Sequence, residues 1–352
     1  MKNWIQACGF KEANLVQKRV MPTLESGKNV IVTSPTGTGK THAFLIPLLA
    51  KTVPNKGLQA VILAPTSILS KQLFTVTESV IKALDLSVTV RHIHKKIDTE
   101  SMHEIVIATP YQLIDAVFKQ SLFGLKNVQT VILDEADMML DQGFIHDLEL
   151  IFTAVPERAQ VGIFSATMHP ALRRFLDRSF PGIKTLNLNP EMLNDQALTS
   201  KYVYVEKARR ITELPRVMGG IQPFFALVFG STKKEVDAIY QALKPHYKDI
   251  AILHGDVAPR EREQLLKKAR KYVYQVIVAS DLAARGIDLP DVSHVVNVSL
   301  PTDPSYFIHR IGRTARVGKP GMQITLYEKA DLEFFEKLKP YGYTVQLKGV
   351  KA

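Results

Sequence analysis

The sequence has a single cysteine, Cys8, and no apolar run as long as the roughly 18 to 20 residues of a membrane span. One cysteine excludes an internal disulfide and a zinc site built from several cysteines, and it is typical of proteins from a reducing compartment. The first ten residues, MKNWIQACGF, also lack the apolar segment of a signal peptide. We therefore expect a cytoplasmic protein that does not span a membrane.

Acidic residues are outnumbered mainly in the second half of the chain. The 352 residues include 45 Lys and Arg against 34 Asp and Glu, a formal net charge of +11. Residues 1–200 carry 20 basic and 18 acidic side chains, a net of +2, whereas residues 201–352 carry 25 and 16, a net of +9. This excess favours a polyanionic partner such as nucleic acid, although basic solvated surfaces without such a partner are as common.

Short apolar runs rich in β-branched residues alternate with helix-length segments along the chain. Strands that are apolar on both faces and separated by helices predict parallel sheets covered by helices, and a polar stretch near residues 187–199 interrupts the pattern. We predict an α/β fold with two domains, residues 1–195 and 196–352. The expected strands are residues 29–33, 60–63, 104–108, 130–133, 161–164, 226–229, 250–253, 275–279, 294–298 and 323–327.

Small and polar residues follow nearly every expected strand, and in open parallel sheets ligands bind outside the carboxyl ends of the strands. The first such segment is SPTGTGKT, residues 34–41, whose backbone N–H groups can surround a phosphate where a helix begins. Lys40 would reach the β and γ phosphates of ATP, and Thr41 would help to bind Mg²⁺. Ser34 stands where this motif usually has its first glycine, and a chance glycine turn is the alternative. The predicted ATP-binding residues here are Thr36, Gly37, Thr38, Gly39, Lys40 and Thr41.

Three carboxylates, Asp134, Glu135 and Asp137, follow the strand expected at residues 130–133. Ionised carboxylates at the mouth of a core are costly unless a cation or hydrogen bonds compensate them. Asp134 would hold Mg²⁺, directly or through water, and Glu135 would orient or deprotonate the water that attacks the γ-phosphate. An acidic helix N-cap would explain one of the three, and we expect Asp137 to link this strand end to neighbouring loops.

Three arginines, Arg310, Arg313 and Arg316, recur at three-residue intervals in HRIGRTARVG, residues 309–318. Taken alone, this spacing is typical of a solvated helix face. Opposite a nucleotide, however, the guanidinium groups would offer paired donors to the charge that develops during phosphoryl transfer. The phosphate-binding motif therefore favours a role at the nucleotide.

An ordered series of motifs makes the chain resemble the DEAD-box RNA helicases of superfamily 2, from Gly9 to about Tyr327. The motifs are GFKEANLVQ, SPTGTGKT, DEAD, SAT, VFGSTK, HGD, ASDLAARGID and HRIGRTAR. The resemblance implies two RecA-like domains, with ATP and Mg²⁺ as cofactors and RNA as the partner. It also implies that Gln17 reads the adenine edge, that Asp288 contacts the ribose, and that Arg313 and Arg316 contact the γ-phosphate.

The same resemblance assigns the residues that connect hydrolysis to RNA. Asp137, Ser165, Thr167 and His309 would couple the two sites. The expected RNA contacts are Thr66, Thr109, Thr232, Arg262, Ser280, Arg285 and Gly286.

Several positions depart from the family pattern. Ser67 and Gln112 replace two arginines that the family uses near RNA phosphates. The usual glycine pair between them is absent, and RHIHKK occupies residues 91–96 of that neighbourhood. Trp4 would either cap the adenine pocket or anchor the first helix. These departures leave the ATP site intact and imply weaker RNA binding by the first domain.

The most economical reading is a monomeric ATP-dependent RNA helicase that contacts the RNA backbone with little base specificity and closes its two domains when ATP bridges them. Ribosomal or ribonucleoprotein assembly partners fit small bacterial members of the family. An ATP-gated RNA clamp or assembly scaffold with little unwinding is the main alternative. A DNA translocase of the same superfamily and an RNA-binding protein without ATPase activity are two others.

Overall fold

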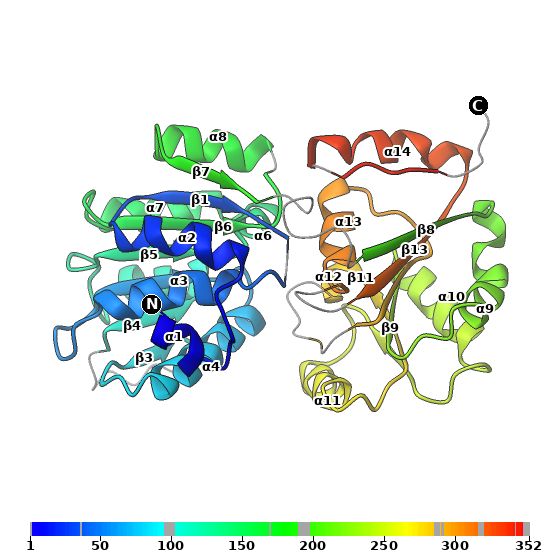
Figure 1. Cartoon of the computed structure of the whole chain (residues 1–352), viewed down its shortest axis with the longest axis horizontal. Helices are drawn as coiled ribbons and strands as arrows, with labels where there is room; N and C mark the ends of the chain where they lie inside the picture. The colour runs from blue at the N-terminus through cyan, green and yellow to red at the C-terminus, as the bar shows by residue number, and fades with distance from the viewer. Residues whose placement is uncertain are drawn as a thin grey trace. The chain divides into compact units, whose positions relative to one another are not determined.

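The computed structural model describes residues 2–35, 37–94, 103–168, 170–188, 198–284, 289, 292–315, 320–341 and 343–347. The chain forms two compact units, the first made of residues 1–34 and 38–189 and the second containing residues 190–352 (Figure 1). Each unit has its own sheet and its own core. The domain boundary predicted at residue 195 lies outside the described residues.

The first unit contains a parallel sheet of seven strands in the order β3-β4-β2-β5-β6-β1-β7. The strands are β1 Val30–Thr33, β2 Ala60–Leu63, β3 Val90–His92, β4 Ile105–Ala108, β5 Thr130–Leu133, β6 Gln160–Ser165 and β7 Lys184–Asn187. The helices are α1 Lys2–Ala7, α2 Leu15–Glu25, α3 Lys40–Lys51, α4 Ser67–Ala83, α5 Pro110–Ile114, the π-helical turn Asp115–Lys119, α6 Ala136–Asp141, α7 Ile145–Ala154 and α8 Pro170–Ser179.

The second unit contains a parallel sheet of six strands in the order β10-β11-β9-β12-β13-β8. Its strands are β8 Leu198–Tyr204, β9 Ala226–Gly230, β10 Ile250–Leu253, β11 Val276–Ser280, β12 His294–Asn297 and β13 Gly321–Tyr327. Its helices are α9 Arg210–Gly219, α10 Lys233–Leu243, α11 Pro259–Ala269, α12 Asp281–Ala284, α13 Pro304–Ile311 and α14 Leu332–Glu336, with 3₁₀ turns at Lys207–Arg209, Lys329–Asp331 and Lys339–Tyr341.

The predicted α/β class with two parallel sheets is confirmed, and each of the ten expected strands is present. The central strands β2, β4 and β5 are buried at every position, as expected where helices cover both faces of a sheet. Three strands were missed: β3, β7 and β8. All three carry partly or fully exposed residues, and β3, β7 and β8 lie at sheet edges. An edge strand has one neighbour only, so its sequence need not be apolar.

The strand order places the motif-bearing loops side by side. In the first sheet, β5, β6 and β1 are consecutive neighbours, and parallel pairing brings their carboxyl ends to one edge. In the second sheet, β10, β11, β9 and β12 are consecutive in the same way. Residues separated by more than 100 positions in the chain therefore meet at the first of these edges.

Candidate active site

The loop after β1 has the shape of a phosphate-binding turn. Gly37 and Gly39 adopt left-handed backbone conformations, with φ of 78° and 86°. A Cβ atom at Gly39 would lie 2.5 Å from Asn14 Nδ2, so only glycine fits there. Lys40, which begins α3, donates from Nζ to the Ser34 carbonyl at 2.9 Å, and the Ser34 hydroxyl lies 2.7 Å from the Thr38 hydroxyl. Ser34 thus replaces the usual glycine without opening the turn.

Two predicted residues complete the description of this loop. Thr41 follows Lys40 in the first turn of α3, a helix of 12 residues whose N-terminal N–H groups favour an anion. Thr36 lies outside the described residues.

The segment after β5 brings a carboxylate to the same lysine. Lys40 Nζ lies 3.6 Å from Glu135 Oε1, and both side chains are largely buried. Glu135 has a left-handed backbone, φ 55° and ψ 52°, which is uncommon for a residue with a Cβ atom and is often found at functional sites. Burial raises the pKa of the Asp134 carboxyl, the Glu135 charge raises it further, and the Lys40 charge opposes both. This concentration of negative charge fits a metal cation.

Asp137 connects two neighbouring strand ends. Its Oδ2 atom accepts hydrogen bonds from the Thr167 backbone N–H at 2.9 Å and from the Thr167 hydroxyl at 2.6 Å. The Ser165 hydroxyl donates to the Thr167 carbonyl at 2.6 Å, and the Asp137 N–H donates to Ser165 Oγ at 3.3 Å. All three residues are buried. The segment after β5 therefore cannot move without disturbing the segment after β6.

A residue that sequence reasoning missed, Asn14, joins α2 to the phosphate-binding turn. Asn14 caps α2 and forms a reciprocal pair with Gln17, in which each backbone N–H donates to the other side chain at 2.9 Å. Its Nδ2 also donates to the Thr38 carbonyl at 3.0 Å. The capping pattern Asn-x-x-Gln was the available signal. Gln17 is 1% exposed, and within the described part of the chain its Nε2 atom has no hydrogen-bond partner.

Trp4 anchors the first helix, which was one of its two predicted roles. It packs with Cys8 and Ala13 against the small buried cluster of Ile5, Met21 and Ile46.

The three threonines predicted to contact RNA all cap helices. Thr66, Thr109 and Thr232 lie at the N-termini of α4, α5 and α10, and each side-chain oxygen accepts a backbone N–H three residues later. Sequence reasoning did not find this shared local role. The two departures from the family arginines also meet, because Gln112 Nε2 donates to Ser67 Oγ at 3.2 Å. Their positions are thus adjacent at the carboxyl ends of β2 and β4, which are paired strands.

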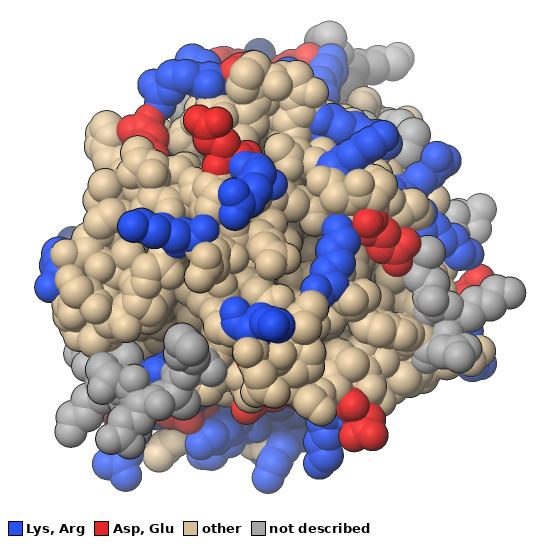
Figure 2. Space-filling model, turned by 90° about the vertical axis from the view of Figure 1, so that its left-hand side faces the viewer, with Lys and Arg blue, Asp and Glu red and all other residues tan. Residues whose placement is uncertain are grey.

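Figure 2 shows how charged side chains are distributed on one face of the first unit. On the face drawn in Figure 2, Lys and Arg side chains stand apart from one another, with uncharged surface and a few acidic side chains between them. This view shows no continuous basic patch on that face.

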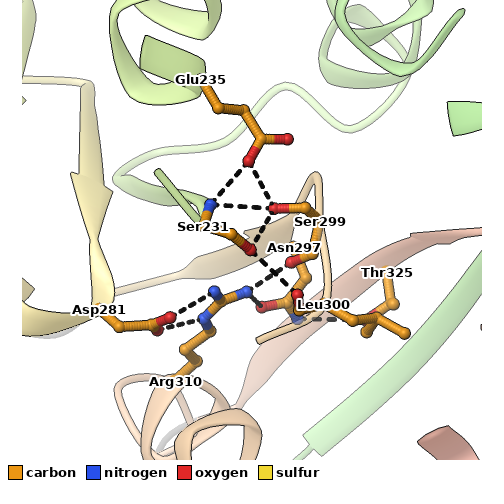
Figure 3. Close-up of polar contacts among 8 residues, drawn as sticks. All are labelled: Ser231, Glu235, Asp281, Asn297, Ser299, Leu300, Arg310 and Thr325. Atoms are coloured by element: carbon orange, nitrogen blue, oxygen red, sulfur yellow. Dashed lines mark hydrogen bonds and ion pairs between the residues drawn. The ribbon is translucent and has the colours of Figure 1, made fainter. Parts of the chain in front are cut away.

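In the second unit, Arg310 is not available to a nucleotide, contrary to the expectation from its spacing. Its residue is 2% exposed, and its guanidinium group binds both oxygens of Asp281, at 2.5 Å from Nε and 2.7 Å from Nη2 (Figure 3). Nη1 donates to the Ser299 carbonyl at 2.6 Å and to Asn297 Oδ1 at 3.2 Å. Arg310 lies on α13, which ends at Ile311, and the helix turns its side chain into the core, whereas Arg313 follows the helix.

A second group of hydrogen bonds adjoins Arg310. Ser231 and Ser299 lie 2.8 Å apart through their hydroxyl oxygens, and Glu235 Oε2 accepts from the Ser231 N–H at 2.7 Å and from the Ser299 hydroxyl at 2.9 Å (Figure 3). The carboxyl ends of β9 and β12 and the start of α10 are therefore held together beside α13.

The remaining predicted residues of the second unit are placed as follows. His309, in the last turn of α13, and Arg313, two residues after the helix, are both buried. Arg262 is half-buried, its Nη2 atom donates to the Ala283 carbonyl at 2.6 Å, and burial lowers the pKa of its guanidinium. Ser280 ends β11. Four predictions lie outside the described residues: Arg285, Gly286, Asp288 and Arg316.

Comparison with known proteins covers both units. The family model for DEAD/DEAH box helicases matches residues 14–175, and the model for the helicase conserved C-terminal domain matches residues 212–318. The chain is 35% identical over 346 residues to the DEAD-box ATP-dependent RNA helicase CshB of Listeria monocytogenes, a match that covers 96% of this chain and 79% of that protein.

Solved structures give the same result. The chain resembles S. cerevisiae Dbp5 bound to RNA and ADP BeF3 with a TM-score of 0.85 and 30% identity, over 98% of this chain and 91% of that one. It also resembles Mss116p bound to ssRNA and AMP-PNP, with a TM-score of 0.82 and 27% identity, over 97% and 75% of the two chains. The predicted RecA-like fold of both units is confirmed.

Proposed function

We propose that this chain, which belongs to the DEAD-box family of ATP-dependent RNA helicases, hydrolyses ATP in order to separate RNA strands locally or to remodel RNA–protein complexes. One observation carries the proposal. The structure gathers Lys40, Asp134 and Glu135 beside a glycine turn, and it links this group through Asp137 to Thr167 at the next strand end. Such a link is what coupling between ATP and a second ligand requires.

The residues present fit ATP with Mg²⁺. Gln17 keeps a buried amide N–H₂ group without a partner among the described residues, as a donor for an adenine edge would. The turn at Gly39 leaves no room for a side chain, so backbone N–H groups can approach a phosphate. Lys40 would bind the β and γ phosphates, and Thr41 and Asp134 would hold the metal. When bound, Mg²⁺ neutralises charge on the phosphates during their transfer.

Glu135 is the candidate general base. Its left-handed backbone holds the carboxylate near Lys40, and its Oε2 atom has no hydrogen-bond partner among the described residues. An acceptor in this state can orient a water molecule and take its proton. The strain of the backbone is consistent with a position selected for chemistry rather than for stability.

RNA is the proposed partner, as it is of Dbp5 and Mss116p in the structures above. Contacts to phosphate and ribose would give little base specificity. We place these contacts at Thr66 and Thr109 in the first unit and at Thr232, Arg262 and Ser280 in the second. The proposal also includes RNA contacts at Arg285 and Gly286. It keeps Asp288 at the ribose, Arg313 and Arg316 at the γ-phosphate, and His309 in coupling.

The proposal extends to the setting of the protein. In the part of the chain that the structure describes, no helix has the length and apolar character that a membrane crossing requires. A monomer in the cytoplasm, working on ribosomal or other ribonucleoprotein assemblies, agrees with the composition and with the family.

An ATP-gated RNA clamp with little unwinding is a second candidate, which one observation favours. Ser67 and Gln112 bond to each other at the place where the family pattern has two arginines. The first unit would then hold RNA weakly. A strand-displacement assay run beside an ATPase assay separates the two functions, because a clamp would hydrolyse ATP in the presence of RNA without releasing the labelled strand.

The proposed function is tested by Glu135→Gln. The substitution keeps the shape of the side chain but removes the base, so turnover should fall by at least about 10²-fold while ATP and RNA still bind. Glu157→Gln, at an exposed position of the same unit, is the matched control and should behave as the unmodified protein. RNA-stimulated ATPase activity at the unmodified level in Glu135→Gln would remove the catalytic role.

A further inference from the structure

The second unit exposes an unusual cluster of apolar side chains at the amino ends of its strands. Phe224 precedes β9 and is 68% exposed, the largest value for an aromatic residue in the described part of the chain. Tyr272 and Val273 precede β11 and are 42% and 45% exposed. Because β9 and β11 are paired, the Phe224 and Tyr272 rings meet, with centroids 5.3 Å apart and planes at 50°. We call these three residues the aromatic patch.

The patch stands on a rigid base. The Tyr272 ring packs edge-on against the buried Phe225 ring at 6.1 Å. Gln275 Nε2 donates to the Pro223 carbonyl at 2.8 Å, and the Gln275 carbonyl accepts from the Ala226 N–H at 2.8 Å. The two loops that carry the rings are therefore tied together, so a ligand would not have to order them.

The backbone at Tyr272 argues against a purely structural role. Tyr272 has φ 54° just after α11, where its N–H bonds to the Ala269 carbonyl and the Val273 N–H bonds to the Lys268 carbonyl. Glycine is the usual residue at this point of a helix end, and a residue with a side chain costs about 1 kcal/mol or more there. A ring that remains 42% exposed recovers only part of that cost by burial.

A run of basic residues leads into the same loop. Residues 264–280 contain Lys267, Lys268, Arg270 and Lys271 and no Asp or Glu, and all four basic side chains are exposed. Lys267 and Lys268 lie in the last turn of α11, where the helix dipole favours a cation, and Lys267 also forms an ion pair with Glu263 at 3.2 Å. Arg270 and Lys271 lie beyond the helix, and Lys271 is adjacent to Tyr272 in the chain. This run supplies four of the basic residues behind the positive excess of the second half.

We propose that the aromatic patch and this basic run form a second binding site, specific for single-stranded RNA. Exposed aromatic rings stack on unpaired bases and neighbouring cations bind the phosphates, whereas the bases of a duplex are not accessible to such rings. The site lies at the amino ends of β9 and β11, opposite Thr232 and Ser280 at the carboxyl ends. The choice of RNA rests on the proposed function, but binding at this site does not require ATP.

The experiment measures RNA binding to the full chain without nucleotide, by fluorescence anisotropy with a labelled unstructured 20-nucleotide RNA. Phe224→Ala combined with Tyr272→Gly should weaken binding by at least about fivefold, because one lost base stack is worth roughly 1 to 3 kcal/mol. Glycine relieves the backbone at position 272, so misfolding is not expected, and thermal unfolding verifies this. Tyr204→Ala, which removes another exposed ring at the β8 edge, is the matched control.

Charge is tested separately by Lys268→Gln with Lys271→Gln. The slope of log affinity against log salt should become shallower by about 1.4, which is roughly 0.7 for each lost phosphate contact. Lys201→Gln with Lys207→Gln, two exposed positions at or near the β8 edge, should leave the slope unchanged. The kcat of the ATPase at saturating RNA should be unchanged in every variant, because none of these residues belongs to the ATP site.

Three results would overturn the second site. The first is an unmodified RNA affinity in the variant that combines Phe224→Ala with Tyr272→Gly. The second is an equal loss of affinity for single-stranded RNA and for a duplex of the same length. The third is that the unmodified protein forms a dimer and that this variant dissociates it without any change in RNA binding. The last would identify a surface for self-association. A failure of the proposed function is distinguished from all three, since the unmodified protein would then show no RNA-stimulated ATPase activity.

Discussion

The bond between Asp281 and Arg310 should be a main support of the second unit, and Asp281→Asn tests this. Asparagine keeps the size of the side chain but removes the charge and one of the two acceptors that the guanidinium uses. Arg310 would then remain ionised in the core, with its side chain 1% exposed. The contacts to Asn297 and to the Ser299 carbonyl would remain but would not neutralise it.

The magnitude follows from the burial of the pair. Removing one partner of a buried ion pair costs about 3 to 5 kcal/mol, because the other charge stays buried without compensation. For a unit of about this size, each kcal/mol lowers the midpoint of thermal unfolding by roughly 2 to 4 °C, so a fall of roughly 6 to 20 °C is expected. Differential scanning calorimetry of the full chain should show the loss in one transition and leave the other in place.

Two controls make the result specific. Asp256→Asn removes an acidic partner from the exposed pair with Lys233 and should cost no more than about 1 kcal/mol. Asp281→Leu with Arg310→Met replaces both charges by apolar groups and should recover most of the stability lost in Asp281→Asn. If Asp281→Asn unfolds within 2 °C of the unmodified protein, the buried bond is not the reason for Arg310, and a direct role at the nucleotide regains support.

Three further predictions concern the first unit. Gly39→Ala forces a Cβ atom to 2.5 Å from Asn14 Nδ2 at a φ of 86°. ATP affinity measured by calorimetry should fall by about 5- to 30-fold, which corresponds to about 1 to 2 kcal/mol of strain. The control Gly124→Ala, at a position with open space around it, should leave the affinity unchanged. Ser67→Arg with Gln112→Arg should steepen the slope of log RNA affinity against log salt in the ATP state by about 0.7 for each new phosphate contact. An unchanged slope, together with a large loss of RNA affinity on neutralising Arg91, Lys95 and Lys96, would show that those residues already replace the family arginines. Burial, with smaller contributions from His94 and Lys71, lowers the pKa of His92 to about 4, so at this side chain the folded state binds fewer protons than the unfolded state. The free energy of unfolding should therefore decrease as the pH falls from about 6.5 towards 4, and urea titrations should show a smaller decrease in His92→Gln.

Short-range patterns in the sequence were sufficient to predict the two α/β units and most of the proposed ATP site. Buried parallel strands need apolar residues on both faces, so they could be recognised as short apolar runs, and the edge strand β10 kept enough of this pattern to be recognised with them. The phosphate-binding turn could be recognised from residues 34–41 alone, because its glycines and lysine reveal it without knowledge of any distant partner. Asp134 and Glu135 could be assigned because three carboxylates within four residues at a strand end need a cation.

What only the tertiary structure decided depends on partners far apart in the chain. The role of Arg310 is set by Asp281, 29 residues earlier, and no helical spacing reveals which face of α13 enters the core. Asn14 reaches Thr38 and Gln112 reaches Ser67 across 24 and 45 residues. The edge strands β3, β7 and β8 were missed because hydrogen bonds to a single neighbour, rather than burial on both faces, hold them in the sheet. Pairing of this kind is independent of residue type, and it therefore leaves little trace in the sequence.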